Sequence, residues 1–229
     1  MSSYSKKTNQ NFSLEIILTE KTSEISSIVI NHLHTNCNKP FITKELLKKY
    51  NAVQALYNDI SVLAFPMYLG DLSFADYKTW HCIPYITYPQ EPRFLTARNE
   101  KRKKEDGRPA KNEKNIGLLG VDALDIKTEK IFLTEGIWDM LCLNYFGFSS
   151  IGIPGVSNLD EAWTSLFKNK IVYIIFDNDK AGEEYSIKHA KKIYLIAKEV
   201  RIIKIPKEID NHKIKDLCDI FIAFKKKKA

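Results

Sequence analysis

Lys170–Gly182, with the sequence KIVYIIFDNDKAG, is the stretch that decides the fold. Its apolar run, Ile171 to Phe176, is rich in β-branched residues, which is typical of a strand buried on both faces of a parallel sheet. The run stops at Asp177 and Asp179, and open α/β sheets bind ligands at the carboxyl ends of their strands. Carboxylates at such a strand end suit a hard divalent cation such as Mg2+. The structural alternative is that Asp179 only caps the helix that follows.

From Lys127 onward, segments with strand character alternate with segments of helical character. This alternation predicts an α/β domain with right-handed crossovers, in which a parallel, Rossmann-like sheet of about four strands is flanked by helices. The predicted strands are Lys130–Thr134, Ser149–Ile153, Ile171–Phe176 and Val200–Ile205, and the predicted helices are Gly136–Tyr145, Leu159–Phe167, Glu183–Ile196 and Ile214–Phe224. If the strands are parallel, their carboxyl ends meet at one edge of the sheet.

Further acidic residues fall at that same edge. Glu135 follows the first predicted strand, and Asp139 lies four residues on, so both face the same side at the start of a helix. Together with Asp177 and Asp179 they would repel one another in a low dielectric unless cations lie among them. This crowding favours a Mg2+ site over a set of unrelated caps. Asp216 opens the last predicted helix and is either its cap or a further metal ligand.

The part of the chain before Lys127 is less regular, and we divide it into two regions. Residues 1–79 are predicted to form a mainly helical N-terminal region, with a short helix from Lys44 to Tyr50 capped by Thr43 and irregular pieces from Val53 to Asp76. Residues 80–126 are predicted to form a smaller basic strand and loop subdomain. Residues 127–229 complete the chain as the α/β domain.

A strongly basic loop, Arg98 to Lys114, lies within the second region. Four consecutive basic residues, Lys101 to Lys104, stand near its start. Such a run is most often a solvated loop, but it is also the composition of a surface that tracks nucleic-acid phosphates. The formal net charge of the chain is +7, which favours a polyanionic partner without identifying it.

Several classes of protein are disfavoured by what the sequence contains. Its four cysteines are far apart and form no CxxC pair, so we expect no zinc site. The polar N-terminus lacks a hydrophobic signal region and no apolar run reaches the roughly 20 residues that span a bilayer, so we expect a cytoplasmic protein without a membrane partner. No P-loop and no GxGxxG fingerprint is present, which argues against an ATP motor or a dinucleotide enzyme.

Two motifs carry a resemblance to a known family. Glu135 lies in TEGxxD and Asp177–Gly182 reads DxDxAG, and at this separation they resemble the toprim domain of bacterial-type primases, type IA and II topoisomerases and some nucleases. The combination is most similar to the primase branch, including bacteriophage primase–helicases. Weaker upstream similarity, at Ile83-Pro84, Arg93–Leu95 and Lys114–Gly120, extends the resemblance over roughly Ile42 to Phe224.

The resemblance implies roles for named residues. Glu135 would be the catalytic acid/base or a metal-linked glutamate, Asp177 and Asp179 would hold Mg2+ as part of the catalytic set, and Asp139 and Asp216 would support the metal site. Mn2+ could replace Mg2+. Arg93 and Lys114 would contact template or nucleotide phosphates, and we add Arg98 and Lys180 as further candidates. The implied partners are single-stranded DNA, nucleoside triphosphates and a replicative helicase.

The chain departs from replicative primases in lacking the cysteines of their zinc-binding domain, so we expect start-site choice to come from a partner or to be relaxed. Three functions remain open. The first is a primase-like nucleotidyltransferase that makes short primers on single-stranded DNA for a phage, plasmid, mobile element or chromosome. The second is a Mg2+-dependent toprim nuclease, and the third is a non-catalytic nucleic-acid-binding replication accessory. A topoisomerase is disfavoured because the chain has no room for a separate domain with a nucleophilic tyrosine.

Overall fold

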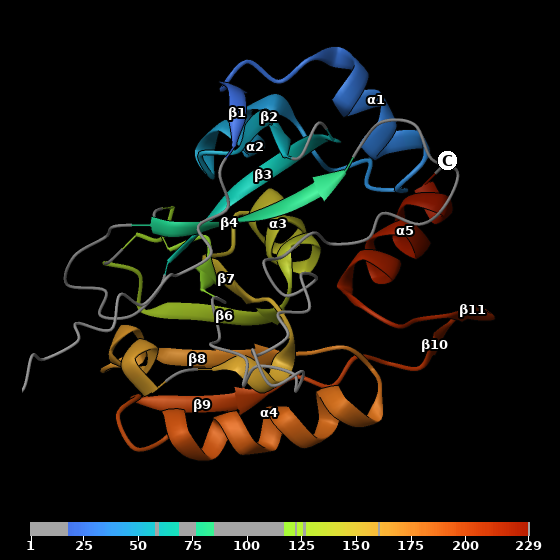
Figure 1. The fold of residues 1–229 in the computed structure, drawn as a ribbon. Coiled ribbons are helices and arrows are strands. Elements are labelled where there is room, and N and C mark those ends of the chain that lie inside the picture. Colours follow the sequence, from blue (N-terminus) through green and yellow to red (C-terminus); the bar gives the residue numbers. More distant parts are fainter. Residues whose placement is uncertain are drawn as a thin grey trace, which may run out of the picture.

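The computed structural model describes residues 18–57, 60–68, 77–84 and 117–228, except residues 122, 126 and 160. These residues form a mixed α/β fold around a nine-stranded sheet (Figure 1). The strand order is β1-β2-β3-β5-β7-β6-β8-β9, and β4 pairs with β3 beside this path. A separate two-stranded hairpin, β10 (Glu208–Ile209) and β11 (His212–Lys213), precedes the last helix. No helix among the described residues is long and apolar enough to cross a membrane.

The parallel half of the sheet confirms the predicted fold class. Its strands, in spatial order, are β7 (Ser150–Ile153), β6 (Lys130–Glu135), β8 (Ile171–Ile175) and β9 (Glu199–Ile202), and each neighbouring pair is parallel. Glu135 pairs in register with Ile153, and Thr134 pairs with Ile175. The carboxyl ends of these strands therefore lie level with one another, as a site built on one edge of the sheet requires.

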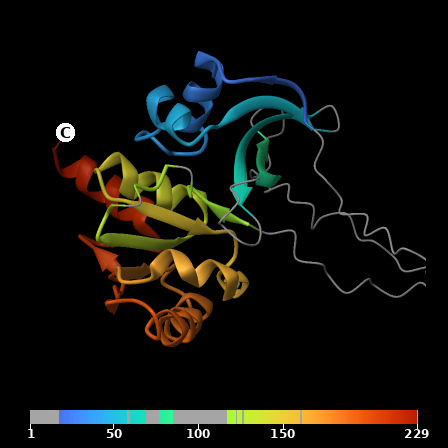
Figure 2. The same cartoon turned by 90° about the vertical axis from the view of Figure 1, so that its left-hand side faces the viewer.

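Helices cover the two faces of this half (Figure 2). On one face, α4 (Lys180–Ile193) and the 3-10 helix Glu161–Phe167 bury side chains against the strands, in a cluster that includes Trp163, Phe167 and Ile193. On the other face, α3 (Ile137–Tyr145) and α5 (Leu217–Lys228) pack together and contribute Leu143 and Ala223 to a second cluster. The short 3-10 turn Val156–Asn158 also contacts α4.

Three predicted helices differ in type or bounds from the structure. The segment predicted as the helix Leu159–Phe167 is 3-10, and the Thr164 hydroxyl there donates to the Glu161 carbonyl at 2.6 Å, in competition with the backbone. Helix α4 begins at Lys180 rather than Glu183 because Asp179 caps it. Helix α5 begins at Leu217 rather than Ile214, because Asp216 caps it by accepting from the Asp219 amide.

The upstream region corrects the prediction of a mainly helical segment and of irregular pieces from Val53 to Asp76. Its helices are short, and more of its described residues lie in strands than in helices, as the bounds show: β1 (Thr19–Thr22), α1 (Ser27–Thr35), α2 (Lys44–Lys49), β2 (Val53–Tyr57), β3 (Ile60–Tyr68), β4 (Tyr77–Pro84) and β5 (Leu118–Leu119). The predicted cap is confirmed, since Thr43 Oγ1 accepts from the Leu46 amide at 3.1 Å. The predicted boundary after residue 79 falls inside β4.

Pro66 lies inside β3, within the segment predicted to be irregular. A proline removes a donor from the ladder, so an interior strand tolerates it only where no partner needs that donor. On one edge of β3, pairing with β2 ends at Ala64 and pairing with β5 begins at Met67. Pro66 therefore sits in the gap between two partner strands, and β3 continues through it.

Candidate metal centre

Glu135 stands where β6 ends and α3 begins. Its carboxylate is half-buried and accepts a hydrogen bond from the Asp177 backbone, while its Oε2 is buried without a hydrogen-bond partner among the described residues. The turn that follows packs closely on the neighbouring strand, because a Cβ at Gly152 would collide with the Gly136 carbonyl oxygen. Glu135 is thus fixed at the sheet edge with one acceptor oxygen left over.

Asp177 and Asp179 stand at the corresponding end of β8. The Asp177 side chain is 15% exposed, and its Oδ2 lies 3.3 Å from Lys215 Nζ. Asp179 Oδ1 accepts from the Gly182 amide at 2.8 Å, so the helix-cap alternative is correct for one of its oxygens. Gly182 allows this arrangement, since any Cβ there would collide with the Asp177 carbonyl oxygen. We call Glu135, Asp177 and Asp179 the outer carboxylates.

Asp139 and Asp216, which we call the inner pair, lie deeper and belong to a different set of contacts. Asp139 is only 3% exposed, and its Oδ1 accepts from both the amide and the thiol of Cys218, each at 3.3 Å. Asp216 Oδ1 accepts from the Asp219 amide at 2.8 Å and so caps α5. One ligand atom each from Asp139, Asp216 and Cys218 lie within 4.8 Å of one another.

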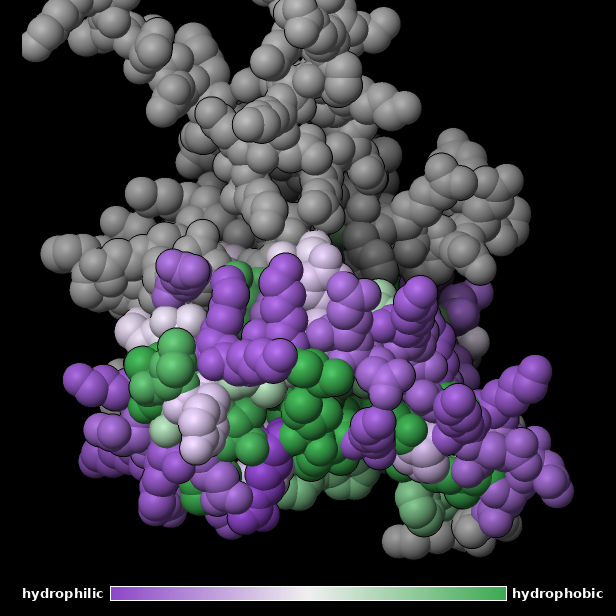
Figure 3. Space-filling model, turned by 90° about the horizontal axis from the view of Figure 1, so that it is seen from below, coloured by the Kyte–Doolittle hydropathy of each residue, from purple (hydrophilic) through white to green (hydrophobic). Residues whose placement is uncertain are grey.

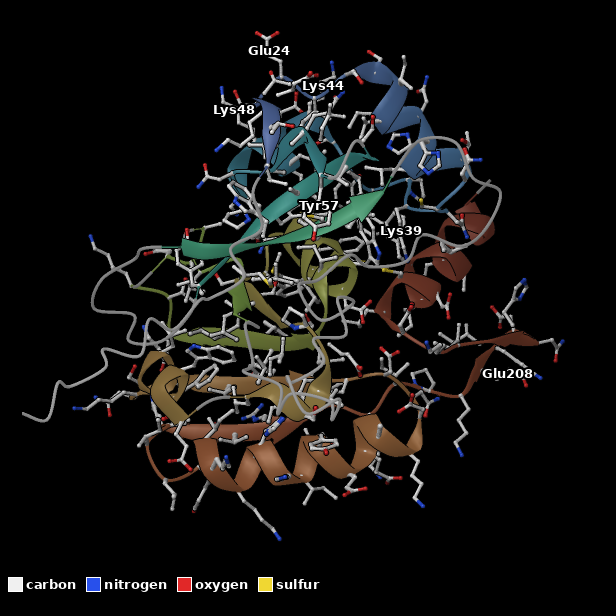
Figure 4. The ribbon with its side chains drawn as sticks, viewed as in Figure 1. Glu24, Lys39, Lys44, Lys48, Tyr57 and Glu208 are labelled. Carbon is white, nitrogen blue, oxygen red and sulfur yellow. The ribbon has the colours of Figure 1, made fainter. Side chains whose placement is uncertain are left out.

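Lys39 lies in the loop between α1 and α2, near α5 (Figure 4), and its ammonium interacts electrostatically with the inner pair. Burial alone would lower the pKa of its ammonium, but Cys218, Asp216 and Asp139 more than offset that effect and raise the pKa. Its Nζ also lies 5.9 Å from the centre of the Trp138 ring. The inner pair therefore has a cation supplied by the chain itself.

The electrostatics of the outer carboxylates reflect their crowding. Burial, followed by the charges of Asp177 and Asp179, raises the pKa of Glu135 to about 7. Burial also raises the pKa of Asp177, although Lys215 opposes the shift. For the inner pair, burial and the charge of Asp216 raise the pKa of Asp139 to about 7. Carboxylates held near one another in this way gain from a bound cation.

The structure brings five of the predicted site residues to one edge of the sheet, namely Glu135, Asp139, Asp177, Asp179 and Asp216. Lys180 lies at the first turn of α4 and is exposed. Arg93, Arg98 and Lys114, with the rest of the predicted basic loop, lie outside the described residues.

Three residues of this site were missed in the sequence. Cys218 and Lys215 flank Asp216, so proximity to a predicted ligand was a signal that could have identified both. Lys39 gave no signal, because it lies 100 positions before Asp139 and comes from another part of the fold.

Residues 132–220 match a family model described as Toprim-like. An uncharacterized protein of Mycoplasma genitalium is 30% identical over 123 residues, which cover 50% of this chain. The chain spans 55% of the length of that curated relative.

Two solved structures are similar in fold. The primase fragment of the bacteriophage T7 primase-helicase protein has a TM-score of 0.55 and 15% identity, covering 84% of this chain and 70% of that one. The Aquifex aeolicus primase, comprising zinc-binding and RNA polymerase domains, has a TM-score of 0.50 and 16% identity, covering 91% of this chain and 48% of that one. At these identities the similarity concerns the fold alone. Residues 132–220 are thus similar to the Toprim-like family, and the fold of the chain resembles that of these two primase structures.

Proposed function

We propose that this chain is a Mg2+-dependent, primase-like nucleotidyltransferase that makes short oligonucleotides on single-stranded DNA from nucleoside triphosphates, with Mn2+ able to replace Mg2+. One observation carries the proposal: Glu135 keeps a buried acceptor oxygen without a partner beside two further carboxylates at the carboxyl edge of the sheet. An all-oxygen donor set of this kind fits Mg2+. Without a cation these carboxylates repel one another, so binding a cation between them is favourable.

Asp177 and the free oxygen of Asp179 would hold the cation. When bound, the cation neutralises charge on the triphosphate and lowers the pKa of the attacking hydroxyl. Glu135 Oε2, with the pKa of its carboxyl near 7, is suited to accept the proton of that hydroxyl. The hydroxyl oxygen forms a bond to the α-phosphorus, the bond to the bridging oxygen breaks, and pyrophosphate leaves.

Other residues would position the substrates. Lys215 is 68% exposed beside Asp177, so its ammonium can turn from the carboxylate to a nucleotide phosphate. Lys180 is exposed at the start of α4, where the helix dipole also favours a phosphate. Arg93, Arg98 and Lys114 remain candidate contacts to template or nucleotide. We further propose a cytoplasmic setting and a replicative helicase as partner, and the inner pair would support the site from behind.

The decisive experiment is a labelled-nucleotide assay on a single-stranded DNA template with Mg2+ or Mn2+. Wild type, Glu135→Gln and Glu183→Gln are compared. Glu183 is a matched control because it is an exposed acid in the first turn of α4, paired with Lys204 at 2.9 Å. We expect short products from wild type and Glu183→Gln and none from Glu135→Gln or with EDTA.

Each other outcome contradicts the proposal in a different way. Products from Glu135→Gln would show that the reaction does not need the Glu135 carboxylate. Cleavage of the template without nucleotides would identify the toprim nuclease. Binding of the template without synthesis or cleavage, and equal in Asp177→Asn, would identify the non-catalytic accessory.

A further inference from the structure

Lys215 has an anchored main chain and an exposed side chain. Its amide donates to Asp219 Oδ2 at 2.8 Å, and its carbonyl accepts from the Asn178 amide, also at 2.8 Å. Asn178 lies between Asp177 and Asp179, so the main chain of Lys215 is attached to the loop that carries two of the outer carboxylates. The side chain is 68% exposed, and its Nζ lies 3.3 Å from Asp177 Oδ2. The ammonium can therefore change its partner while the rest of the residue stays at the site.

The ion pair between Lys215 and Asp177 differs from four others among the described residues, in which the carboxylate side chain is at least 41% exposed. Those four are Lys192–Glu161, Lys198–Glu129, Arg201–Glu199 and Lys204–Glu183. Most of them involve α4 or β9, on the side of the molecule where hydrophilic side chains surround hydrophobic ones (Figure 3). The side chain of Asp177 is only 15% exposed. It has less water around it and therefore depends more on a neighbouring cation.

The Asp177 carboxylate is also the group that would hold the metal in the proposed function. The Lys215 ammonium faces one of its oxygens, and Glu135 crowds it with a further negative charge. Two cations beside one carboxylate repel each other, and they do so more strongly in a partly buried site than in water. Lys215 and the metal therefore compete for Asp177.

A triphosphate changes this competition, because it offers the ammonium another anion. Phosphate oxygens accept charge-assisted hydrogen bonds from lysine, and the exposed side chain of Lys215 is free to turn toward them. Once the ammonium has turned, Asp177 is available to the metal. Each of the two ligands thus removes an obstacle to the binding of the other, and by thermodynamic linkage the two effects on affinity are equal.

A fixed structural cation would have different surroundings. Lys39 provides the comparison, because it is half-buried, interacts with the inner pair and lies 5.9 Å from the centre of the Trp138 ring. Lys215 instead leaves most of its side chain in water and holds Asp177 through the ammonium alone. This exposure suits a cation that changes partners.

We propose that Lys215 competes with the metal for Asp177 and gives way when a nucleoside triphosphate binds, so that metal and nucleotide bind cooperatively. The inference rests on the proposed function, because it concerns the cation and the triphosphate of the same site. It adds a regulation of that site, in which the protein holds the metal weakly until the substrate arrives.

The test measures Mn2+ binding to the full chain, without template, from the electron paramagnetic resonance signal of free Mn2+. Wild type, Lys215→Met, Lys215→Arg and Lys213→Met are titrated alone and with an adenosine triphosphate analogue that has methylene between its α- and β-phosphorus. Lys213 is the matched control, because it is an exposed lysine of β11 two positions before Lys215. Binding that persists in Asp177→Asn is subtracted. The analogue itself chelates Mn2+ equally in every titration, so differences between the proteins report the lysine.

Without nucleotide, Lys215→Met should bind Mn2+ at least about fivefold more tightly than wild type, whereas Lys215→Arg and Lys213→Met should stay within about twofold of wild type. The analogue should lower the Kd for Mn2+ in wild type by a factor about five times larger than in Lys215→Met. Since the Lys215 side chain is mostly exposed, its replacement should leave the fold intact, which circular dichroism checks.

Three results would overturn the inference: equal Mn2+ affinity in wild type and Lys215→Met, an equal gain in Lys213→Met, or an equal effect of the analogue on wild type and Lys215→Met. Wild type would still make oligonucleotides in each of these cases if the proposed function is correct. If the expected Mn2+ shifts appear but wild type makes no products, nucleotidyl transfer fails while the competition stands. A lack of any Mn2+ binding that depends on Asp177 would overturn both.

Discussion

The outer carboxylates and the inner pair lie at the same edge of the sheet, yet their surroundings differ. Glu135 keeps a buried oxygen without a partner, and Asp177 faces the exposed Lys215. Asp139 is almost completely buried, accepts a hydrogen bond from Cys218 and interacts electrostatically with the ammonium of Lys39. The outer group thus has an acceptor oxygen to spare, whereas the inner pair already interacts with a cation of the chain, Lys39. Acidic residues of one motif can therefore divide into a reactive group and a structural group.

The largest expected effect separates the two groups by activity. Asp177→Asn should lower oligonucleotide synthesis at least about 100-fold, because it removes a charge on which the cation depends. Asp139→Asn should stay within about tenfold of wild type, because asparagine keeps an acceptor for Cys218. Incorporation of labelled nucleotide at matched protein concentration measures the activity of both variants. Equal losses would show that the outer carboxylates and the inner pair do not differ in function.

The second prediction tests whether Lys39 neutralises the inner pair. Lys39→Met should lower the free energy of unfolding by about 2 kcal/mol, because it leaves buried carboxylates without their cation. Lys44→Met is the control, since Lys44 is exposed at the start of α2. Urea denaturation measures the change. The double variant Lys39→Met/Asp139→Asn should recover part of the loss, and strict additivity of the two changes would speak against an electrostatic interaction between the two residues.

The third prediction uses pH in the absence of metal. The folded-state pKa values of Glu135 and Asp139 are both raised to about 7, above those of the unfolded chain. Folding therefore favours their protonated forms, and their contribution to stability is lost as pH rises from about 4 to about 7. Allowing for solvent screening, the loss is on the order of 2 kcal/mol for half-buried Glu135.

Unfolding titrations at pH 5 and pH 8, with and without Mg2+, measure this loss. Mg2+ should restore stability at pH 8 and have little effect at pH 5. Glu135→Gln should flatten the metal-free pH dependence and abolish the Mg2+ effect. The pH dependence of Glu135→Gln gives the contribution of the other titrating groups. If, after that contribution is subtracted, the metal-free wild type is more stable at pH 8 than at pH 5, the raised pKa of Glu135 is contradicted.

The smallest expected effect concerns Lys215. Its ion pair with Asp177 is largely solvent-exposed on the lysine side, so Lys215→Met should change stability by no more than about 0.5 kcal/mol. If the ammonium turns to nucleotide phosphates, KM for the nucleotide should rise several-fold while kcat changes little. Steady-state incorporation kinetics distinguish this from a purely structural role, in which neither constant would move.

Sequence patterns predicted the parallel half of the sheet because its signals are local. An apolar run followed by Asp177 and Asp179, and Glu135 before a glycine, each mark a strand end within a few residues. Local sequence patterns did not predict β3, because this strand tolerates Pro66 only through a gap between two partner strands that come from elsewhere in the chain.

The candidate site shows the same limit. The carboxylates could be predicted because each follows a strand or opens a helix. The inner pair could not be separated from the outer carboxylates, because that difference comes from Lys39 and from the depth of Cys218. Contacts between residues far apart in sequence, and the burial that they produce, leave no periodic pattern to read.

Strand β5 consists of only Leu118 and Leu119, yet it pairs with β3 on one side and with β7 on the other. Successive side chains of a strand point to opposite faces, and the two leucines enter different hydrophobic cores. If this short strand detached, both cores would open together and the sheet would part between its antiparallel and parallel halves. We therefore expect the upstream region and the toprim-like domain to unfold as one cooperative unit, with coincident transitions by different spectroscopic probes.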